Sequence, residues 1–466
     1  MQTKTKTEAQ LHQLTEGSYL FCCPQGNILL GCPPEILKRI LATHLPMPDT
    51  VVVPQVLHHQ SSSQASLEFP LYHFLFVQRG LERNRQFRVI ATQPQCRGLS
   101  ELLRITVVGP DAAEMEKSGQ DAGLSKELYQ ETLFMALKDS KTRQAFPIEH
   151  MVQFTPLENG KHCEVYPNRQ KLPACRVERL GDAKFRVLYG EDAFLVDLAI
   201  KAPQEPNYPI QHKPHHRAKG GFSLTVLGRS NGFDPKDGAN GYLLDLNGKL
   251  VLWDCPAYLH LHLKALKIGM EDLDGMVLSH VHEDHIDVVE SVAKKPLTVY
   301  TTPEIYYSML MKLTAVFGCS LEEAKAMHRW VRIDTGKPID IAGGQWTFFH
   351  AVHAIPALGV RLAFQAQGKS GLLHISGDHL SNSALATMLE AGGISKRRYE
   401  QMISLINGKE DLLLVDVGGG IIHGDYRDYL EYKGKGRIGF MHTGLVPSDL
   451  PANMKLVDSG EVWTIF

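Results

Sequence analysis

Several features that would assign the chain to a special class of protein are missing from its sequence. No apolar run is long enough to span a membrane, and residues 1–10 lack the apolar segment of a signal peptide. The eight cysteines are scattered and form no Cys-x-x-Cys pair, which argues against a disulfide scaffold. The sequence therefore predicts a cytoplasmic protein with reduced thiols and no membrane partner.

An excess of charge of either sign is also missing. The 466 residues carry a formal net charge of −2, so no overall field would draw the chain to nucleic acid or to an anionic membrane. Two short basic stretches stand out, Lys396-Arg-Arg398 and Lys433-Gly-Lys-Gly-Arg437. RNA-processing enzymes hold their substrate with a longer basic arm, so these stretches do not favour that function. The charge pattern favours a small-molecule substrate and is compatible with a homo-oligomer.

Histidine, by contrast, is concentrated in one place. The stretch His280-Val-His-Glu-Asp-His285 holds three imidazoles and the Asp284 carboxylate within six positions, and apolar residues lie on both sides of it. Neutral imidazoles and carboxylates are the usual ligands of zinc, and of iron or manganese as well. A strand that ends in such a loop before a helix would direct all four side chains into one pocket. The stretch therefore predicts a metal site.

The spacing His-x-His-x-Asp-His resembles that of the metallo-β-lactamase fold. The resemblance implies that His280 and His282 bind a first metal, and that Asp284 and His285 bind a second one. The apolar segment 249–253 ends in Asp254 and follows a hairpin with an Asn-Gly turn at 247–248. In the family, an aspartate at this place orients the ligand loop, which assigns Asp254 a catalytic role without contact to metal.

The remaining ligands implied by the resemblance follow in order along the chain. The family's third histidine comes about 70 residues after the cluster, which favours His353 over its neighbour His350, since Pro356 and Gly359 follow it as in the family. The bridging carboxylate is expected at Asp378, in Ser-Gly-Asp after an apolar strand. The last ligand is expected at His442, at the end of the apolar segment 438–441.

The alternative to His442 is His423, which lies in the glycine-rich segment Gly418-Gly-Gly-Ile-Ile-His-Gly424. His423 is placed on the substrate side of the pocket, where its imidazole would face the scissile group. The predicted metal ligands are thus His280, His282, Asp284, His285, His353, Asp378 and His442. The predicted catalytic residues are Asp254, Asp284 and His423. The cofactor is expected to be two divalent ions, with zinc as the first candidate and iron or manganese as alternatives.

The predicted fold is α/β, with a metallo-β-lactamase αββα sandwich at 222–466 after an α+β domain at 1–200. Residues 201–217 hold four prolines and no apolar periodicity, so 201–221 is expected to be a linker whose histidines 212, 215 and 216 solvate a loop. The N-terminal domain contains no second His-x-His-x-Asp-His. Its expected elements are a helix at 33–41, strands at 50–54 and 72–77, a helix from Ser125 as N-cap, and a hairpin at 184–197.

A dinuclear centre of this kind suits the hydrolysis of phosphodiesters, thioesters and lactones. The diiron oxygen-reducing branch of the family carries glutamate where His282 stands, which argues against that chemistry. The segment 418–425 resembles the cyclic-nucleotide phosphodiesterases of this superfamily. The sequence therefore predicts a metal-dependent phosphodiesterase for a cyclic nucleotide or a related phosphodiester. A lactonase or thioesterase, or a metal-binding or redox sensor without hydrolytic turnover, remains as the alternative.

Overall fold

The computed structural model describes residues 9–59, 62–165, 175–216, 220–292, 296–420, 422–443 and 445–466. Contacts within the chain divide it into two compact units. Unit 1 comprises Met1–Arg104, Phe146–Asn207 and Lys312–Cys319, and unit 2 comprises Ile105–Ala145, Tyr208–Met311 and Ser320–Phe466. The division at 1–200, 201–221 and 222–466 stays a prediction, and the structure groups residues 105–145 with the C-terminal unit. The described part of the chain contains no helix with the length and apolar composition that a membrane crossing requires.

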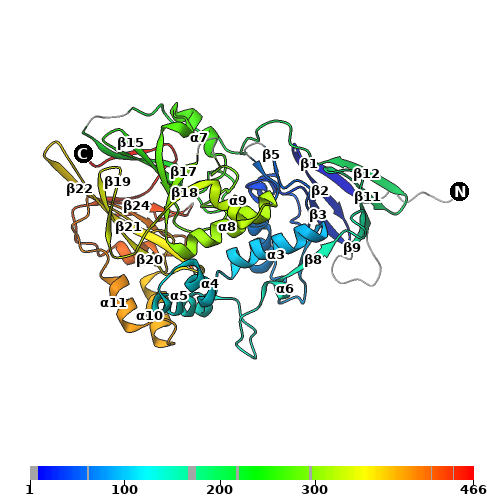
Figure 1. Ribbon diagram of the computed structural model, residues 1–466, viewed down its shortest axis with the longest axis horizontal. Helices are drawn as coiled ribbons and strands as arrows, with labels where there is room; N and C mark the ends of the chain where they lie inside the picture. The colour runs from blue at the N-terminus through cyan, green and yellow to red at the C-terminus, as the bar shows by residue number, and fades with distance from the viewer. Residues whose placement is uncertain are drawn as a thin grey trace. The chain divides into compact units, whose positions relative to one another are not determined.

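Unit 2 is built around two seven-stranded sheets (Figure 1). The first sheet has the spatial order β18 (His328–Arg332), β17 (Leu297–Thr301), β16 (Leu273–Val277), β15 (Lys249–Trp253), β14 (Gly241–Leu246), β13 (Phe222–Gly228) and β26 (Val462–Thr464). The second has the order β19 (Pro338–Ile341), β20 (Gly344–Ala351), β21 (Ala357–Ala366), β22 (Lys369–Ile375), β23 (Leu412–Asp416), β24 (Arg437–Met441) and β25 (Met454–Leu456).

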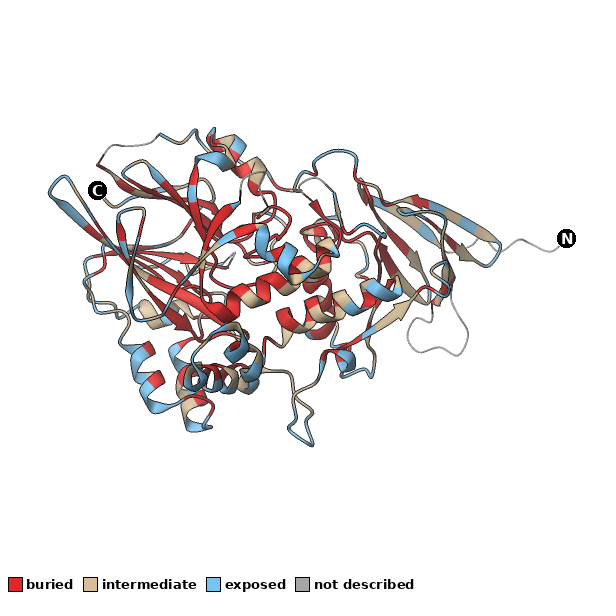
Figure 2. Ribbon diagram, in the orientation of Figure 1, coloured by how far each residue is buried: buried red, intermediate tan, exposed pale blue. Residues whose placement is uncertain are grey.

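The two sheets pack face to face, and helices cover their other faces. Phe222 of the first sheet contacts Phe364 of the second edge to face, with 5.4 Å between ring centroids. On the second sheet, α5 (Ala122–Met135), α10 (Asn382–Glu390) and α11 (Lys396–Ile403) share one apolar cluster with Phe349 of β20. Next to the first sheet, Tyr306 of α8 (Pro303–Phe317) stacks on Trp330 of β18. Strands are buried between these layers (Figure 2), and the result is the predicted αββα sandwich.

Both sheets change from antiparallel to parallel pairing, and this change positions the site. In the first sheet, β13, β14 and β15 form an antiparallel meander, and β16 and β17 then add in parallel. The predicted turn between β14 and β15 is confirmed, because Asn247 and Gly248 both have positive φ, 57° and 86°, as a two-residue hairpin turn requires. In the second sheet, β22, β23 and β24 are parallel. The carboxyl ends of these parallel strands are where α/β proteins place ligands.

Unit 1 contains a six-stranded sheet and a four-stranded antiparallel sheet. The larger sheet has the order β1 (Gln10–Thr15), β2 (Ser18–Cys23), β3 (Gly26–Leu30), β4 (Thr50–Val52), β7 (Phe87–Ala91) and β8 (Val152–Pro156). The smaller sheet has the order β12 (Asp192–Asp197), β11 (Lys184–Tyr189), β10 (Cys175–Arg179) and β9 (His162–Val165). The helices are α1 (Ile36–Thr43), α2 (Glu68–Tyr72), α3 (Gln93–Val107), whose last residues fall in unit 2, and α6 (Ile148–Met151).

The larger sheet of unit 1 repeats the topology of the first sheet of unit 2. In each, an antiparallel three-stranded meander is followed by three strands added in parallel and in the same order. An eight-residue helix, α1 or α7 (Leu259–Leu266), precedes the first parallel strand, and a fifteen-residue helix, α3 or α8, follows the second. Cys32 and Cys255 each form an isolated parallel β-bridge at the corresponding place after the meander. The sequence did not reveal this repeat.

Among its described residues, the repeated scaffold has no counterpart to the candidate donor residues of unit 2. The N–H of Gly31 donates to the carbonyl of Val52 in unit 1, as the N–H of Asp254 donates to that of Val277 in unit 2. Glycine thus stands where unit 2 has the Asp254 carboxylate. Among the described residues, every group of three or more His, Cys, Asp or Glu side chains close enough to hold a metal lies in unit 2. Unit 1 therefore keeps the scaffold without the donor set.

Two expectations for the N-terminal part are wrong. Residues 72–77 are helical, because α2 continues into a π-helical turn, η1 (His73–Val77). Aromatic contacts at helical spacing, Phe69 with Tyr72 and Tyr72 with Phe76, stabilise it over the strand that the β-prone composition suggested. The N-cap of α5 is Asp121, whose carboxylate accepts from the N–H of Leu124, and Ser125 is buried inside the helix.

The other expected elements of unit 1 are confirmed, with shifted boundaries. The helix predicted at 33–41 is α1, which begins three residues later, and the strand predicted at 50–54 is β4. The predicted hairpin at 184–197 is formed by β11 and β12, with Tyr189 paired to Asp192 across a turn at Gly190. These segments combine an unambiguous apolar pattern with a proline or glycine at the boundary, which explains why the sequence located them.

Within the segment expected to be a linker, two of the three histidines do not solvate a loop as expected. Residues 201–216 contain no helix or strand, and 217–219 lie outside the described residues. His215 is nonetheless packed, with its Nε2 2.9 Å from the Asp245 carboxylate, and His212 forms a 2.7 Å hydrogen bond with the buried His262. These imidazoles pack against unit 2 rather than solvate a loop, because buried polar partners compete successfully with water.

A buried ion pair connects α5 to α11 inside unit 2 and allows a stability prediction. The guanidinium of Arg398 lies 3.0 Å from the Glu131 carboxylate, both side chains are 3% exposed, and Arg398 also donates to the carbonyl of His350. Glu131→Ala is expected to lower the free energy of unfolding by about 3–5 kcal/mol, because it leaves a buried guanidinium without its carboxylate. Chemical denaturation measures this loss.

The neighbouring ion pair supplies the matched control. Arg397 and Glu127 join the same two helices, but the Arg397 side chain is 75% exposed. Arg397→Ala is expected to cost less than about 1 kcal/mol. Equal losses for the two variants would contradict the role given to burial.

Candidate metal centre

The predicted ligands come from loops at the carboxyl ends of strands in both sheets of unit 2. The loop after β16 carries the cluster 280–285, and its first residues continue the buried strand through Leu278 and Ser279. His353 follows β20, Asp378 follows β22, and His442 follows β24. The structure brings all seven predicted ligands together in two groups that share neighbours, and each of the seven is at most 5% exposed.

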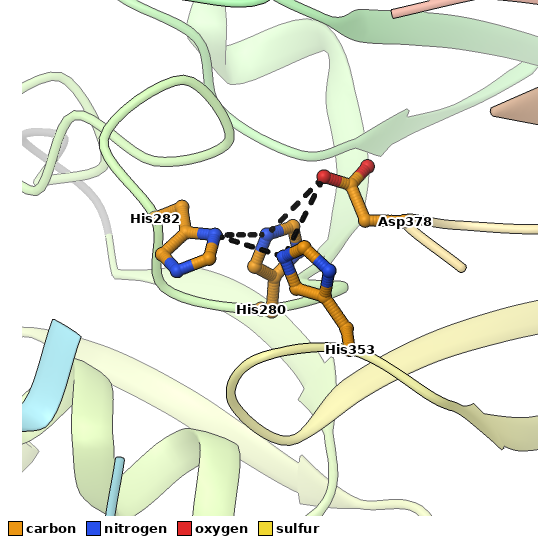
Figure 3. Close-up of side chains that lie close together, drawn as sticks. All are labelled: His280, His282, His353 and Asp378. Carbon is orange, nitrogen blue, oxygen red and sulfur yellow. Dashed lines mark hydrogen bonds and ion pairs between the residues drawn. The ribbon is translucent and has the colours of Figure 1, made fainter. Parts of the chain in front are cut away.

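The first group consists of His280, His282, His353 and Asp378 (Figure 3). The Nδ1 of His282 lies 3.0 Å from the Nε2 of His280 and 3.1 Å from the Nε2 of His353. The Oδ2 of Asp378 lies 3.8 Å from both of these Nε2 atoms. Donor atoms bound tetrahedrally to zinc at 2.0–2.2 Å lie about 3.4 Å from one another. The observed spacing therefore fits a metal ion at the centre.

Hydrogen bonds on the far side of the rings orient these nitrogens. The Nδ1–H of His353 donates to the carbonyl of Ile422 at 3.0 Å, and the Nδ1 of His280 lies 3.0 Å from the Ser279 hydroxyl, which itself donates to Asp254. With a proton on each Nδ1, the Nε2 atoms of His280 and His353 present lone pairs to the centre. Partners of this kind fix the tautomer of metal-binding histidines.

The second group consists of Asp284, His285 and His442. The Nε2 of His442 lies 3.0 Å from the Oδ2 of Asp284 and 3.4 Å from the Oδ2 of Asp378. The Nε2 of His285 lies 3.2 Å from the other oxygen of Asp378. Its Nδ1 donates to Asp254 at 2.8 Å, so Asp254 fixes the ring from behind. Asp378 thus lies between the two groups, where a bridging carboxylate was expected.

The electrostatics differ between the two groups. Burial lowers the pKa of His280 and His282 well below the usual value and lowers the pKa of His353 to about 4. Burial alone would have the same effect on His285 and His442, but the nearby carboxylates, Asp378 first among them, raise the pKa of His285 and raise that of His442 to about 9. The first group thus offers neutral imidazoles, and the second balances ionised carboxylates with protonated imidazoles. A cation that binds there would displace those protons.

The carboxylate of Asp378 provides the clearest indication that a cation fits here. Asp378 is 1% exposed, and within the described residues neither of its oxygens has a hydrogen bond with acceptable geometry. A buried carboxylate needs a compensating positive charge, which either the protonated His285 and His442, 3.2 and 3.4 Å away, or a bound metal ion in place of their protons would supply. The donor set of imidazoles and carboxylates, its spacing and this carboxylate together fit a divalent metal ion.

His423 lies beside both groups and, with Asp378 and His442, forms a third set of side chains close enough to share a metal. Its Nδ1 is 2.9 Å from Asp416 and 3.6 Å from Asp378, and its ring centroid is 4.5 Å from that of His442. The ring is 17% exposed, whereas His442 is 2% exposed. His423 is thus the more accessible of the two late histidines. His350, the rival of His353, is buried elsewhere and bonds Glu304 at 2.8 Å.

The sequence reasoning missed Asp416, which ends β23. Its carboxylate accepts from the N–H of His379 and of Gly418 in addition to its contact with His423. It is 1% exposed, so it positions His423 from inside the protein. An apolar strand that ends in aspartate, as at Leu412–Asp416, is the local pattern that Asp254 and Asp378 share and could have drawn attention to this residue as well.

Comparisons with known proteins agree with this arrangement. Residues 222–357 match the family model described as Anti-Pycsar protein Apyc1. The chain is similar to cGMP-dependent 3′,5′-cGMP phosphodiesterase A of Dictyostelium discoideum, with 30% identity over 159 residues, which are 34% of this chain and 18% of that protein. It is also similar to cAMP/cGMP-dependent 3′,5′-cAMP/cGMP phosphodiesterase B of the same organism, with 21% identity over 482 residues, 91% of this chain and 42% of the relative.

The chain therefore spans less than half the length of these two curated relatives. Among solved structures, the metallo-β-lactamase fold protein YhfI from Bacillus subtilis is 19% identical, with a TM-score of 0.39 over 53% of this chain and all of YhfI. The family match begins at Phe222, the first residue of β13, and continues through the donor loop to His353. From β13 onward, the two facing sheets and the ordered His and Asp residues match the predicted metallo-β-lactamase fold, and the chain is similar in sequence to proteins that include cyclic-nucleotide phosphodiesterases.

Proposed function

We propose that unit 2 is a metal-dependent phosphodiesterase with two divalent ions, and that its substrate is a cyclic nucleotide. The observation that carries the proposal is the pair of donor groups that meet at Asp378. The names of the similar proteins, which include 3′,5′-cGMP and 3′,5′-cAMP/cGMP phosphodiesterases, supply the substrate class. Zinc is the first candidate for the metal, because three imidazoles and a carboxylate suit it well.

The residues of the chain would have the following roles in the reaction. Two bound divalent ions would supply Lewis acidity and lower the pKa of water at the site. Asp254 fixes His285 directly and His280 through Ser279, so the donor atoms are preorganised before substrate arrives. His423 is the accessible imidazole, and the Asp416 carboxylate accepts from its Nδ1–H, which leaves Nε2 as the ring atom that would exchange a proton with the substrate or the leaving oxygen.

The partner is thus a small molecule, and neither a nucleic acid nor a second copy of the chain is needed for this chemistry. Lactones and thioesters carry a carbonyl that the same centre could hydrolyse, so they form the competing substrate class. Without turnover, the centre would instead act as a metal or redox sensor.

A substrate panel tests the proposal. Protein loaded with zinc, iron or manganese is expected to hydrolyse bis-p-nitrophenyl phosphate and at least one of the 2′,3′- or 3′,5′-cyclic nucleotides. An acyl-homoserine lactone and a glutathione thioester are expected to react more slowly by about tenfold or more, since two bound ions held by these donors would stabilise the greater negative charge of a phosphoryl group. Turnover of only the lactone or thioester would reverse the assignment. A fully metallated protein that is inert to every substrate would favour the sensor.

A further inference from the structure

The backbone that carries His353 leaves its sheet shortly before this residue. β20 pairs with β21 up to Ala351, which lies opposite Ala357, and Val352 is the first residue beyond the ladder. Val352 is fully buried, so its backbone N–H and carbonyl need partners inside the protein. The partners of these two groups therefore help to determine where His353 lies.

Both partners belong to the segment that follows Asp378. The N–H of Val352 donates to the Nδ1 of His379 at 3.0 Å, and its carbonyl accepts from the N–H of Leu380, also at 3.0 Å. Val352 and Leu380 also pack in the same apolar cluster. The backbone next to His353 is thus joined by two hydrogen bonds to the segment that begins with the shared carboxylate, and one of these bonds uses a side chain.

The side chain and the backbone of His379 have different partners. Because Nδ1 accepts from an N–H, it carries no proton, and the ring proton lies on Nε2. The backbone N–H of His379 donates to the Asp416 carboxylate at 3.1 Å, a bond that any residue except proline would keep. A substitution at position 379 therefore removes the contact to the His353 loop and leaves the contact to Asp416.

The position of His353 matters because a metal ion tolerates little variation in its ligand distances, about 0.2 Å. The Nε2 of His353 lies 3.8 Å from the Asp378 Oδ2 and 3.1 Å from the His282 Nδ1 (Figure 3). The bond from the His353 Nδ1–H to the carbonyl of Ile422 orients the ring. The contacts of Val352 fix the backbone from which that ring extends.

We propose that His379 is a positioning residue for the first donor group, because its imidazole accepts from Val352 and so holds His353 at metal-binding distance. It acts through the backbone and not as a ligand. The proposal rests on the metal centre of the proposed function and deepens it, since a residue outside the donor set governs the affinity for one of the two ions.

Zinc titration of the metal-stripped full-length chain against a chromophoric chelator tests the proposal. Two classes of zinc site are expected, and the class that His280→Ala removes is the first donor group. His379→Leu is expected to weaken this class by about 10–100-fold, the usual effect of a change behind a metal-binding histidine, because the buried N–H of Val352 loses its acceptor. The other class is expected to keep the wild-type affinity.

Two further variants separate this role from simple packing. In His379→Asn the amide oxygen takes the place of Nδ1, since both atoms are bonded to Cγ, and an affinity close to that of the wild type is expected. In His379→Gln the amide lies one bond farther from the backbone, so the loss seen in His379→Leu is expected to persist. If the imidazole only filled space, His379→Gln would bind zinc at least as well as His379→Asn.

The control is His215→Leu, which removes another imidazole of unit 2, one that bonds Asp245 outside the donor groups. It is expected to lower the melting temperature and to leave both zinc affinities unchanged. An unchanged first class in His379→Leu, or an equal loss in both classes, would overturn the positioning role alone. Wild-type protein that takes up no zinc would refute the metal centre and this role together, whereas two zinc sites in a protein inert to every phosphodiester would refute only the proposed function.

Discussion

Asp378→Ala is expected to remove metal from both donor groups and to reduce turnover of a phosphodiester by about 10³-fold or more, since a metal ion contributes several kcal/mol to such a reaction. The reason is that the Asp378 carboxylate lies between the two donor groups. The Asp378 carboxylate lies within 3.8 Å of His280 and His353 in the first group and within 3.4 Å of His285 and His442 in the second. Elemental analysis of dialysed protein measures the loss of metal, and the substrate panel measures the loss of rate.

Two variants serve as controls for this result. His280→Ala removes a donor from the first group alone, so the protein is expected to keep metal in the second. Asp334→Ala removes an exposed carboxylate that pairs with Arg332 and Lys337 on the surface, and it is expected to keep both metals and full activity. Full metal content in Asp378→Ala would show that the two groups do not share this carboxylate.

The candidate site could be predicted from the sequence because its residues follow local rules. Each donor comes directly after an apolar strand or in the loop that follows one, and a strand end is visible as a break in the apolar pattern. Asp254 and Asp378 were assigned because these strand ends stand at the places that the resemblance implies, and His353 was preferred over His350 because of the loop that follows. The structure places His350 against Glu304, away from the donor groups.

Asp416 has the same local signal but was overlooked. Whether a strand-end aspartate lies at the site depends on the position of its strand in the sheet, and the sequence does not show the order of the strands. β23 lies between β22, which carries Asp378, and β24, which carries His442. This neighbourhood results from parallel crossovers between distant segments, which a single sequence does not display. The same limit applies to residues 72–77, where a short apolar run fits a strand or a helix until its packing partners are known.

The repeat in unit 1 was hidden for a related reason. A sheet topology depends on the order and lengths of apolar segments, and these tolerate wide changes in sequence. The features that made unit 2 easy to identify are the polar residues of its loops. Unit 1 has glycine at position 31, where unit 2 has Asp254, and its loop after β4 continues through Pro54 and Gln55 instead of Ser279 and His280. Without the donor set, the sequence of unit 1 gave only isolated elements.

The roles of the two late histidines can be separated by measuring metal and rate together. His442→Ala is expected to remove metal from the second group, because the His442 Nε2 lies 3.0 Å from Asp284 and the residue is buried. His423→Ala is expected to keep the metal content of the wild type and to lose about 10²-fold in turnover, the typical contribution of a general acid or base. Metal loss in His423→Ala with full occupancy in His442→Ala would exchange the two assignments.

Asp416→Asn sharpens this test, because it keeps the shape of the side chain that holds His423 but removes its charge. The Asp416 carboxylate lies 2.9 Å from the His423 Nδ1 and 3.8 Å from the Nδ1 of His442. If His423 acts in catalysis, Asp416→Asn is expected to lower turnover by about 10–100-fold, as changes behind an active-site histidine commonly do, while metal content stays at the wild-type level. A double variant with His423→Ala is then expected to be no slower than His423→Ala alone, because Asp416 acts through that imidazole. Independent, multiplicative losses would instead show that Asp416 acts through His442 and the metal.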